Sequence, residues 1–236
     1  MIKCRMLTPA LIKTSVGKKV IMAVTGLMLF GFVIGHLLGN LQIFLGPDPL
    51  NLYALKLEKL GPILWVIRSV LLTVFILHIL TAIALVRENR KARPIAYTKP
   101  AQIQTTFAAR TMAVSGFLLL VYVIYHLRHF TLNVTDPQFA HLVDSSGHHD
   151  VYGMVILGFQ NKWVSAIYIG AMAILSMHLS HGFSSLFQSL GWNNEKSEPI
   201  LKRLGHVIAI LIFVGYSSIP VAVMMGWLSN TGRGAV

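Results

Sequence analysis

The sequence has little cysteine and little negative charge. Among its 236 residues there is one cysteine, Cys4, and there are only 8 acidic residues. A single cysteine excludes both a disulfide framework and a thiolate-bound iron–sulfur cluster within the chain. Charged residues of both signs make up 12% of the chain, whereas hydrophobic residues make up 55%. This balance excludes an ordinary soluble domain and predicts a protein that crosses a membrane several times.

Basic residues are more plentiful, giving a formal net charge of +12, and their placement is uneven. They lie at the ends of apolar runs and in short loops, which is typical of a membrane protein and argues against nucleic-acid binding. One side of the predicted bundle receives Lys3, Arg5, Lys13, Lys18, Lys19, Arg87, Arg90, Lys91, Arg93, Lys99, Arg110, Lys196, Lys202 and Arg203. The other side receives Lys56, Lys59, Lys162 and Arg233. We therefore expect a protein of the inner (cytoplasmic) membrane with a cytoplasmic N-terminus and a C-terminus outside.

Five apolar runs are each long enough to cross a bilayer as a helix, which takes about 20 residues. They cover about 19–45, 63–86, 107–132, 163–187 and 204–228. The stretch from Asn133 to Lys162 is the longest outer connection. No small-residue cleavage motif follows the first run, so we interpret it as a retained helix and not as a signal peptide. The sequence predicts an all-α protein with one domain, 1–236, built as a bundle of five transmembrane helices.

Four of these runs carry a histidine at membrane depth: His36, His78, His126 and His178, with His181 one turn further on. An ionisable side chain within the membrane is costly and points to a functional site. A histidine on each of four helices amounts to two pairs of axial ligands, which is what two b-type haems need. We therefore predict that the bundle encloses two haems.

The depth of each histidine predicts how the four pair. His36 lies 17 residues after Lys19 and His126 lies 16 after Arg110, so both sit roughly 24–26 Å from the cytoplasmic charges at about 1.5 Å per residue. His78 and His178 lie only about 13–15 Å from that boundary on the same scale. This gives an outer pair, His36 with His126, and an inner pair, His78 with His178. Depth does not decide between His178 and His181.

For the other polar residues, the sequence allows both a role at the haem or quinone site and a purely structural role. Any membrane histidine can simply hydrogen-bond a neighbouring helix, and His129 and His181 can contact a haem propionate or a quinone, or be interfacial. Arg68 and Arg128 can pair with propionates, since a guanidinium matches a carboxylate, or extend to the headgroups. A loose cluster in the outer loop suggests a solvated loop rather than a metal site: His141, Asp144, His148, His149 and Asp150.

Several motifs together resemble a known family. They are Ser15-Val-Gly-Lys-Lys19, Gly35-His36-Leu37, Arg68 with His78-Ile79, Tyr125-His126-Leu127, Asp150-Val-Tyr-Gly-Met154 and His178-Leu-Ser-His-Gly182-Phe-Ser-Ser-Leu-Phe-Gln188. Over nearly its whole length the chain resembles the cytochrome b membrane-anchor subunit of succinate dehydrogenase and fumarate reductase, in the type with five helices and two haems. That family places one haem-ligating histidine in each of its first four helices. Its members differ over the fourth ligand, which corresponds to His178 or His181 here; we favour His178.

The resemblance implies partners and substrates. It implies a flavoprotein with FAD that interconverts succinate and fumarate, and an iron–sulfur subunit docked on the cytoplasmic loops, with room for a higher oligomer. No residue of this chain would act on succinate. Electrons would pass to a quinone, with menaquinone favoured, in respiratory electron transport and the tricarboxylic acid cycle. Ser15 and Lys19 on the inner side, and Glu58 on the outer side, are the candidate quinone contacts.

Two further functions compete with this one. A haem subunit of another respiratory complex, such as a nitrate-reductase-type anchor, would differ in the soluble subunits that co-purify. A haem-free anchor or transporter would use the histidines for packing or as a proton relay. Transport has little support, because the second to fourth spans lack acidic residues and no pair of broken helices is visible.

Overall fold

The computed structural model describes residues 14–92 and 107–229, and every regular element within these ranges is a helix. In chain order they are α2 (Ser15–Asn40), the 3-10 helix η1 (Leu41–Leu45), α3 (Pro47–Glu58), α4 (Pro62–Lys91), α5 (Phe107–His126), the π-helix η2 (Leu127–Thr131), the 3-10 helix η3 (Pro137–His141), α6 (Val151–Gln160), α7 (Lys162–Ser189) and α8 (Ser197–Met224). Of the residues used above, Lys3, Cys4, Arg5, Lys13, Arg93, Lys99 and Arg233 lie outside the described ranges.

Five helical segments are long and apolar enough to cross a membrane: Ser15–Leu45, Pro62–Lys91, Phe107–Thr131, Lys162–Ser189 and Ser197–Met224. The prediction of an all-helical chain with five spans is confirmed, and by length and composition the chain is a multi-pass membrane protein. Large apolar side chains such as Val66 and Leu72 are more than half exposed on α4. A bilayer would cover such surfaces, since apolar area is driven out of water.

The predicted bounds fail mainly at the last helix, which runs from Ser197 to Met224 and not from 204 to 228. It begins earlier because the Asn194 side chain accepts hydrogen bonds from the backbone N–H groups of Lys196 and Ser197. Its first turns are polar and are invisible to a search for apolar runs. It ends earlier because the chain turns at Gly226, whose φ of 74° favours glycine.

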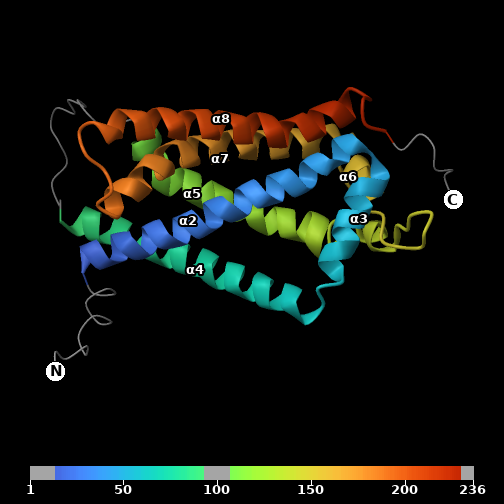
Figure 1. Cartoon of the computed structure of the whole chain (residues 1–236), viewed down its shortest axis with the longest axis horizontal. Coiled ribbons are helices and arrows are strands. Elements are labelled where there is room, and N and C mark those ends of the chain that lie inside the picture. The colour runs from blue at the N-terminus through green and yellow to red at the C-terminus, as the bar shows by residue number, and fades with distance from the viewer. Residues whose placement is uncertain (1–13, 93–106, 230–236) are drawn as a thin grey trace.

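Figure 1 shows the long helices side by side along one axis, with the short elements gathered at one end. α7 and α8 form the most extensive pair, α2 packs against α4 and α7, and α5 packs against α7. We call the end where α2 begins and α4 finishes the basic end, after Lys18, Lys19, Arg87, Arg90 and Lys91. The opposite end, which carries α3, η3 and α6, is the capped end.

At the basic end an ion pair joins the first two spans. The Lys18 ammonium contacts Glu88, and the Ser15 hydroxyl donates to the other Glu88 carboxylate oxygen at 3.4 Å. Glu88 lies beyond the predicted end of the second span, since α4 continues as a helix to Lys91. The Lys18–Glu88 contact links α2 to α4 at the basic end of the bundle.

The stretch 133–162, predicted to be a connection, contains the buried helix α6. Ten residues are too few to cross a bilayer, and α6 is instead packed in the capped end. Tyr152, Val155, Ile156 and Phe159 of α6 form a core with residues of four other elements: Ile43, Leu50, Tyr168, Ile219 and Val223. The capped end therefore has a hydrophobic core of its own and is not simply a loop between two spans.

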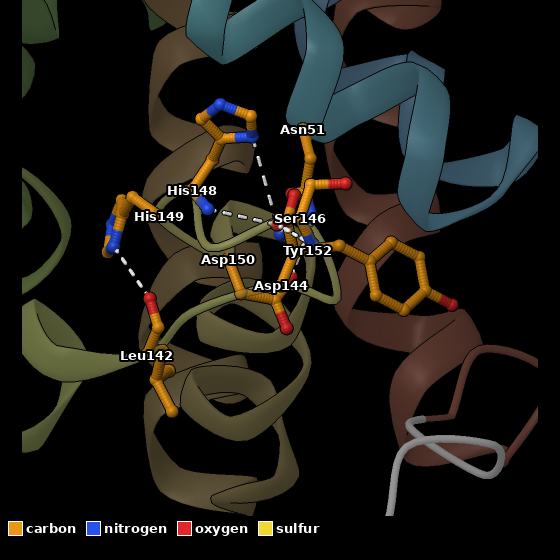
Figure 2. A network of polar contacts seen from close by, with 8 residues as sticks. All are labelled: Asn51, Leu142, Asp144, Ser146, His148, His149, Asp150 and Tyr152. Carbon is orange, nitrogen blue, oxygen red and sulfur yellow. Dashed lines mark hydrogen bonds and ion pairs between the residues drawn. The ribbon is translucent and has the colours of Figure 1, made fainter.

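A buried polar network joins α3 to α6, as Figure 2 shows. The Asn51 side chain donates to Asp150 Oδ1 at 2.8 Å and accepts from the Tyr152 backbone N–H at 2.9 Å. Asp150 also caps α6 by accepting from the Gly153 N–H at 3.0 Å. Each of these groups is buried and satisfied, which stabilises the join.

We expect Asn51→Ala to destabilise the protein by about 1–3 kcal/mol, because it leaves buried hydrogen-bonding groups of α6 without a partner. The thermal unfolding midpoint of the detergent-solubilised protein measures this. Asn89→Ala is the matched control, since Asn89 is exposed on α4. Equal midpoints for the two variants would contradict the role of Asn51.

Candidate functional site

His36 of α2 and His126 of α5 face each other in the interior. Their ring centroids are 5.9 Å apart, with the ring planes at 74°. Phe32 stacks on His36 at 5.3 Å, and the Tyr216 ring of α8 lies 6.2 Å from it. The structure thus brings together the two histidines that depth assigns to the outer pair.

His78 of α4 is held against α2. Its Nδ1 lies 3.0 Å from the Thr25 hydroxyl oxygen. A Cβ added to Gly26 would lie 3.4 Å from His78 Cε1, so the imidazole rests directly on a glycine of the neighbouring helix. Thr25 is buried and packs His78 tightly against α2.

His178 of α7 is held against α5 in the same way. Its Nδ1 lies 2.9 Å from the hydroxyl oxygen of Ser115, which is 1% exposed. A Cβ on Gly116 would lie 3.6 Å from His178 Cε1. A hydroxyl residue followed by a glycine therefore receives each histidine of the inner pair.

These hydroxyls determine which imidazole nitrogen carries the proton. Thr25 Oγ1 donates to the Ile21 carbonyl at 2.7 Å, and Ser115 Oγ donates to the Met112 carbonyl at 3.1 Å. With its single proton given to that backbone carbonyl, each hydroxyl oxygen is left to accept a hydrogen bond from the histidine Nδ1–H. The lone pair of His78 and of His178 is then on Nε2, which is the arrangement typical of metal-ligating histidines.

His181 is placed differently. Its Nε2 lies 3.1 Å from the Ser185 hydroxyl, one turn further along the same helix. Ser184 Oγ donates to the His181 carbonyl at 3.2 Å, so this segment is held by bonds within α7. His178 reaches across to another helix, whereas His181 does not.

His129 was predicted as a spare or interfacial residue, and it is fully buried at 1% exposure. It lies in η2, where α5 widens into a π turn directly after His126; Leu132 N–H bonds to the Leu127 carbonyl at 2.8 Å. Such widened turns often occur at functional sites. The Tyr168 hydroxyl of α7 lies 3.3 Å from His126 Nδ1 and 3.0 Å from His129 Nδ1, and so connects the two.

The far side of His129 faces a carboxylate. Its Nε2 lies 3.5 Å from Asp136 Oδ2. Both residues line a pocket of about 270 Å³ at the capped end, together with Gln138, Phe139, Leu157, Gly158, Asn161 and Val164. A continuous set of polar contacts therefore runs from His126 through Tyr168 and His129 to Asp136.

The other predicted site residues lie apart from the histidine pairs. Arg68 is exposed, with its guanidinium 5.1 Å from the Trp65 ring centroid, and Arg128 is exposed beyond His126. Ser15 and Lys19 are at the basic end, whereas Glu58 is exposed at the end of α3 in the capped end. The structure does not bring the three quinone candidates together.

In the outer loop, Asp144 and His149 make hydrogen bonds to other residues of the same loop. Asp144 accepts from the backbone N–H groups of Ser146 and His148 at 2.8 and 3.0 Å. His149 Nδ1 lies 3.2 Å from the Leu142 carbonyl (Figure 2). Across the described residues, no three His, Cys, Asp or Glu side chains gather as a metal site.

Sequence reasoning assigned no role at the site to Thr25, Ser115 or Tyr168. Their signal was weak, because a hydroxyl in a membrane helix usually bonds to its own backbone and tyrosines are common near a membrane surface. What the arrangement offers chemically is four partly buried imidazoles in the two predicted pairs, of which the His36 and His126 rings face each other. Comparison of the chain with protein-family models, with curated proteins and with solved structures finds no match. The proposed function therefore rests on the resemblance and on these pairs.

Proposed function

We propose that the chain is the dihaem cytochrome b membrane anchor of a succinate:quinone oxidoreductase, passing electrons between an iron–sulfur subunit and the quinone pool. His36 and His126 are the axial ligands of an outer haem, and His78 and His178 those of an inner haem. The observation that carries the proposal is the pairing of imidazoles from different helices, above all the 5.9 Å between the His36 and His126 ring centroids.

This spacing fits a metal between the two rings. A metal–imidazole bond of about 2 Å on each side places two ring centroids about 6 Å apart. An apolar groove of about 290 Å³ lies between α2 and α4 and is lined in part by Phe32, which stacks on His36. The donor type and the spacing of the His36 and His126 rings fit the ligation of a haem iron.

A bound haem b supplies a one-electron centre whose potential depends on its ligands and their hydrogen bonds. The residues of this chain hold the imidazoles and exclude water. Thr25 and Ser115 keep Nδ1 of the inner histidines protonated, and so direct Nε2 to the iron. His178 is the better fourth ligand, because it reaches α5 through Ser115 whereas His181 is bonded to Ser185 of its own helix.

The basic end is the docking surface for the iron–sulfur subunit and faces the cytoplasm in this proposal. Arg87, Arg90 and Lys91 are exposed there, and a positive surface favours a partner of opposite charge. Ser15 and Lys19 lie at the same end, where a quinone would receive electrons close to that subunit. Glu58 is the corresponding candidate at the capped end.

The haem content of the purified complex tests the function. We expect two haems b per chain, a reduced-minus-oxidised spectrum with a b-type α-band, and co-purification with a flavoprotein and an iron–sulfur protein. A chain without this band would be a haem-free anchor or transporter. A dihaem chain that brings down a different set of soluble subunits would belong to another respiratory complex.

A further inference from the structure

The two histidine pairs differ in what supports them. In the inner pair, His78 and His178 each donate to an aliphatic hydroxyl that passes its proton to a backbone carbonyl of its own helix. These contacts end in neutral groups. In the outer pair, His126 is supported by a phenol that leads on to a second histidine and a carboxylate.

The Asp136 carboxylate determines the direction of the hydrogen bonds that join His126, Tyr168 and His129. The Asp136 carboxylate faces His129 Nε2 and favours a proton there, so His129 Nδ1 carries the lone pair. The Tyr168 O–H then donates to His129 Nδ1, and its oxygen accepts from His126 Nδ1–H. His126 is thereby left with its lone pair on Nε2, as in the inner pair.

This set is buried along most of its length. Tyr168 is 5% and His129 1% exposed, while the Asp136 side chain is 36% exposed at the pocket. Aromatic rings surround the phenol, with Phe159 and Tyr122 edge-on at 5.0 and 5.2 Å. Electrostatic interactions act more strongly in such surroundings than in water. The carboxylate therefore acts on His126 through its 3.5 Å contact with His129 and through the two hydrogen bonds of Tyr168.

We propose that Tyr168 is a positioning residue for the outer haem: through His129 and Asp136 it makes His126 a more electron-donating ligand than any ligand of the inner haem. Because a hydrogen bond from Nδ1–H raises the basicity of a ligating imidazole, it stabilises the oxidised iron and lowers its reduction potential. The inference rests on the proposed function and adds a distinction between its two haems.

Redox titration of Tyr168→Phe in the purified complex tests this. We expect the outer haem to shift to a higher midpoint potential, while the midpoint potential of the inner haem stays in place. Asp136→Asn is expected to shift the same haem in the same direction but less, since it changes a partly exposed residue remote from the iron. Electron paramagnetic resonance of the oxidised complex should show one altered haem signal in both variants.

Tyr125→Phe is the matched control. Tyr125 stacks on His129 at 5.5 Å and lies edge-on to Tyr168, so the change removes a neighbouring phenol hydroxyl outside the set. Two haems with unshifted potentials in both Tyr168→Phe and Asp136→Asn would overturn the inference and leave the proposed function intact. Equal shifts of both haems would also overturn it. If Tyr168→Phe fails to fold, Asp136→Asn alone decides, and a wild-type complex without haem overturns the proposed function itself.

Discussion

Single replacement of His36, His78, His126 or His178 by alanine is expected to lower the haem content from two per chain to one. Under the proposed function each haem would have one ligand from each of two helices, and removing an imidazole would leave its iron with a single protein ligand. The pyridine haemochrome of the purified complex, divided by the protein concentration, measures the loss. His36→Ala and His126→Ala should remove the same spectral component, and His78→Ala and His178→Ala the other.

His181→Ala is the informative companion to this series. It should retain both haems, because the His181 ring is bonded to Ser185 of its own helix. His206→Ala is a control for the manipulation itself, since His206 is exposed on α8 and bonds only to the Lys202 carbonyl within its helix. Loss of a haem from His181→Ala, with both retained in His178→Ala, would reverse the assignment of the fourth ligand.

Gly205→Leu is expected to weaken the α7–α8 interface strongly. A Cβ at this position would lie 3.1 Å from the Ser180 backbone carbonyl oxygen and 3.3 Å from Phe183 Cβ. Backbone cannot move aside as a flexible side chain can, so the helices must separate. Overpacking of this kind costs about 1–3 kcal/mol or more. The thermal unfolding midpoint in detergent should fall accordingly.

Gly170→Leu provides the comparison on the partner helix. Gly170 lies exposed on α7, and a Cβ there would meet nothing within 4 Å. We expect its midpoint to match that of the wild type. Similar losses in both variants would mean that the effect comes from replacing a membrane glycine in general and not from the close approach of α7 and α8.

The spans and the histidine pairs could be predicted because both depend on long-range regularities of the sequence. A membrane helix needs about 20 apolar residues, and a histidine among them is conspicuous. The helix rise then converts position into depth, which is why His36 and His126 were expected side by side. α6 escaped prediction because its ten residues are too few for a span and lie between glycines and polar residues that favour a loop.

The supports of the histidines could not be predicted for a different reason. Thr25 donates to the carbonyl four residues earlier, and Thr73, Thr81 and Thr111 do the same. Only the crossing of α2 and α4 makes Thr25 an acceptor for His78. In the same way, the single tyrosine that meets both His126 and His129 is selected by the packing of α5 on α7 and by the π turn, neither of which has a sequence signature.

The uneven packing of the bundle bears on how the protein is assembled. α7 and α8 are joined along their length, whereas α4 and α5 have few contacts with each other. Parting α4 from α5 therefore disrupts little, although these two helices carry His78 and His126, one ligand from each pair. Under the proposed function, a flat cofactor can enter the inserted bundle through this seam while α7 and α8 stay closed.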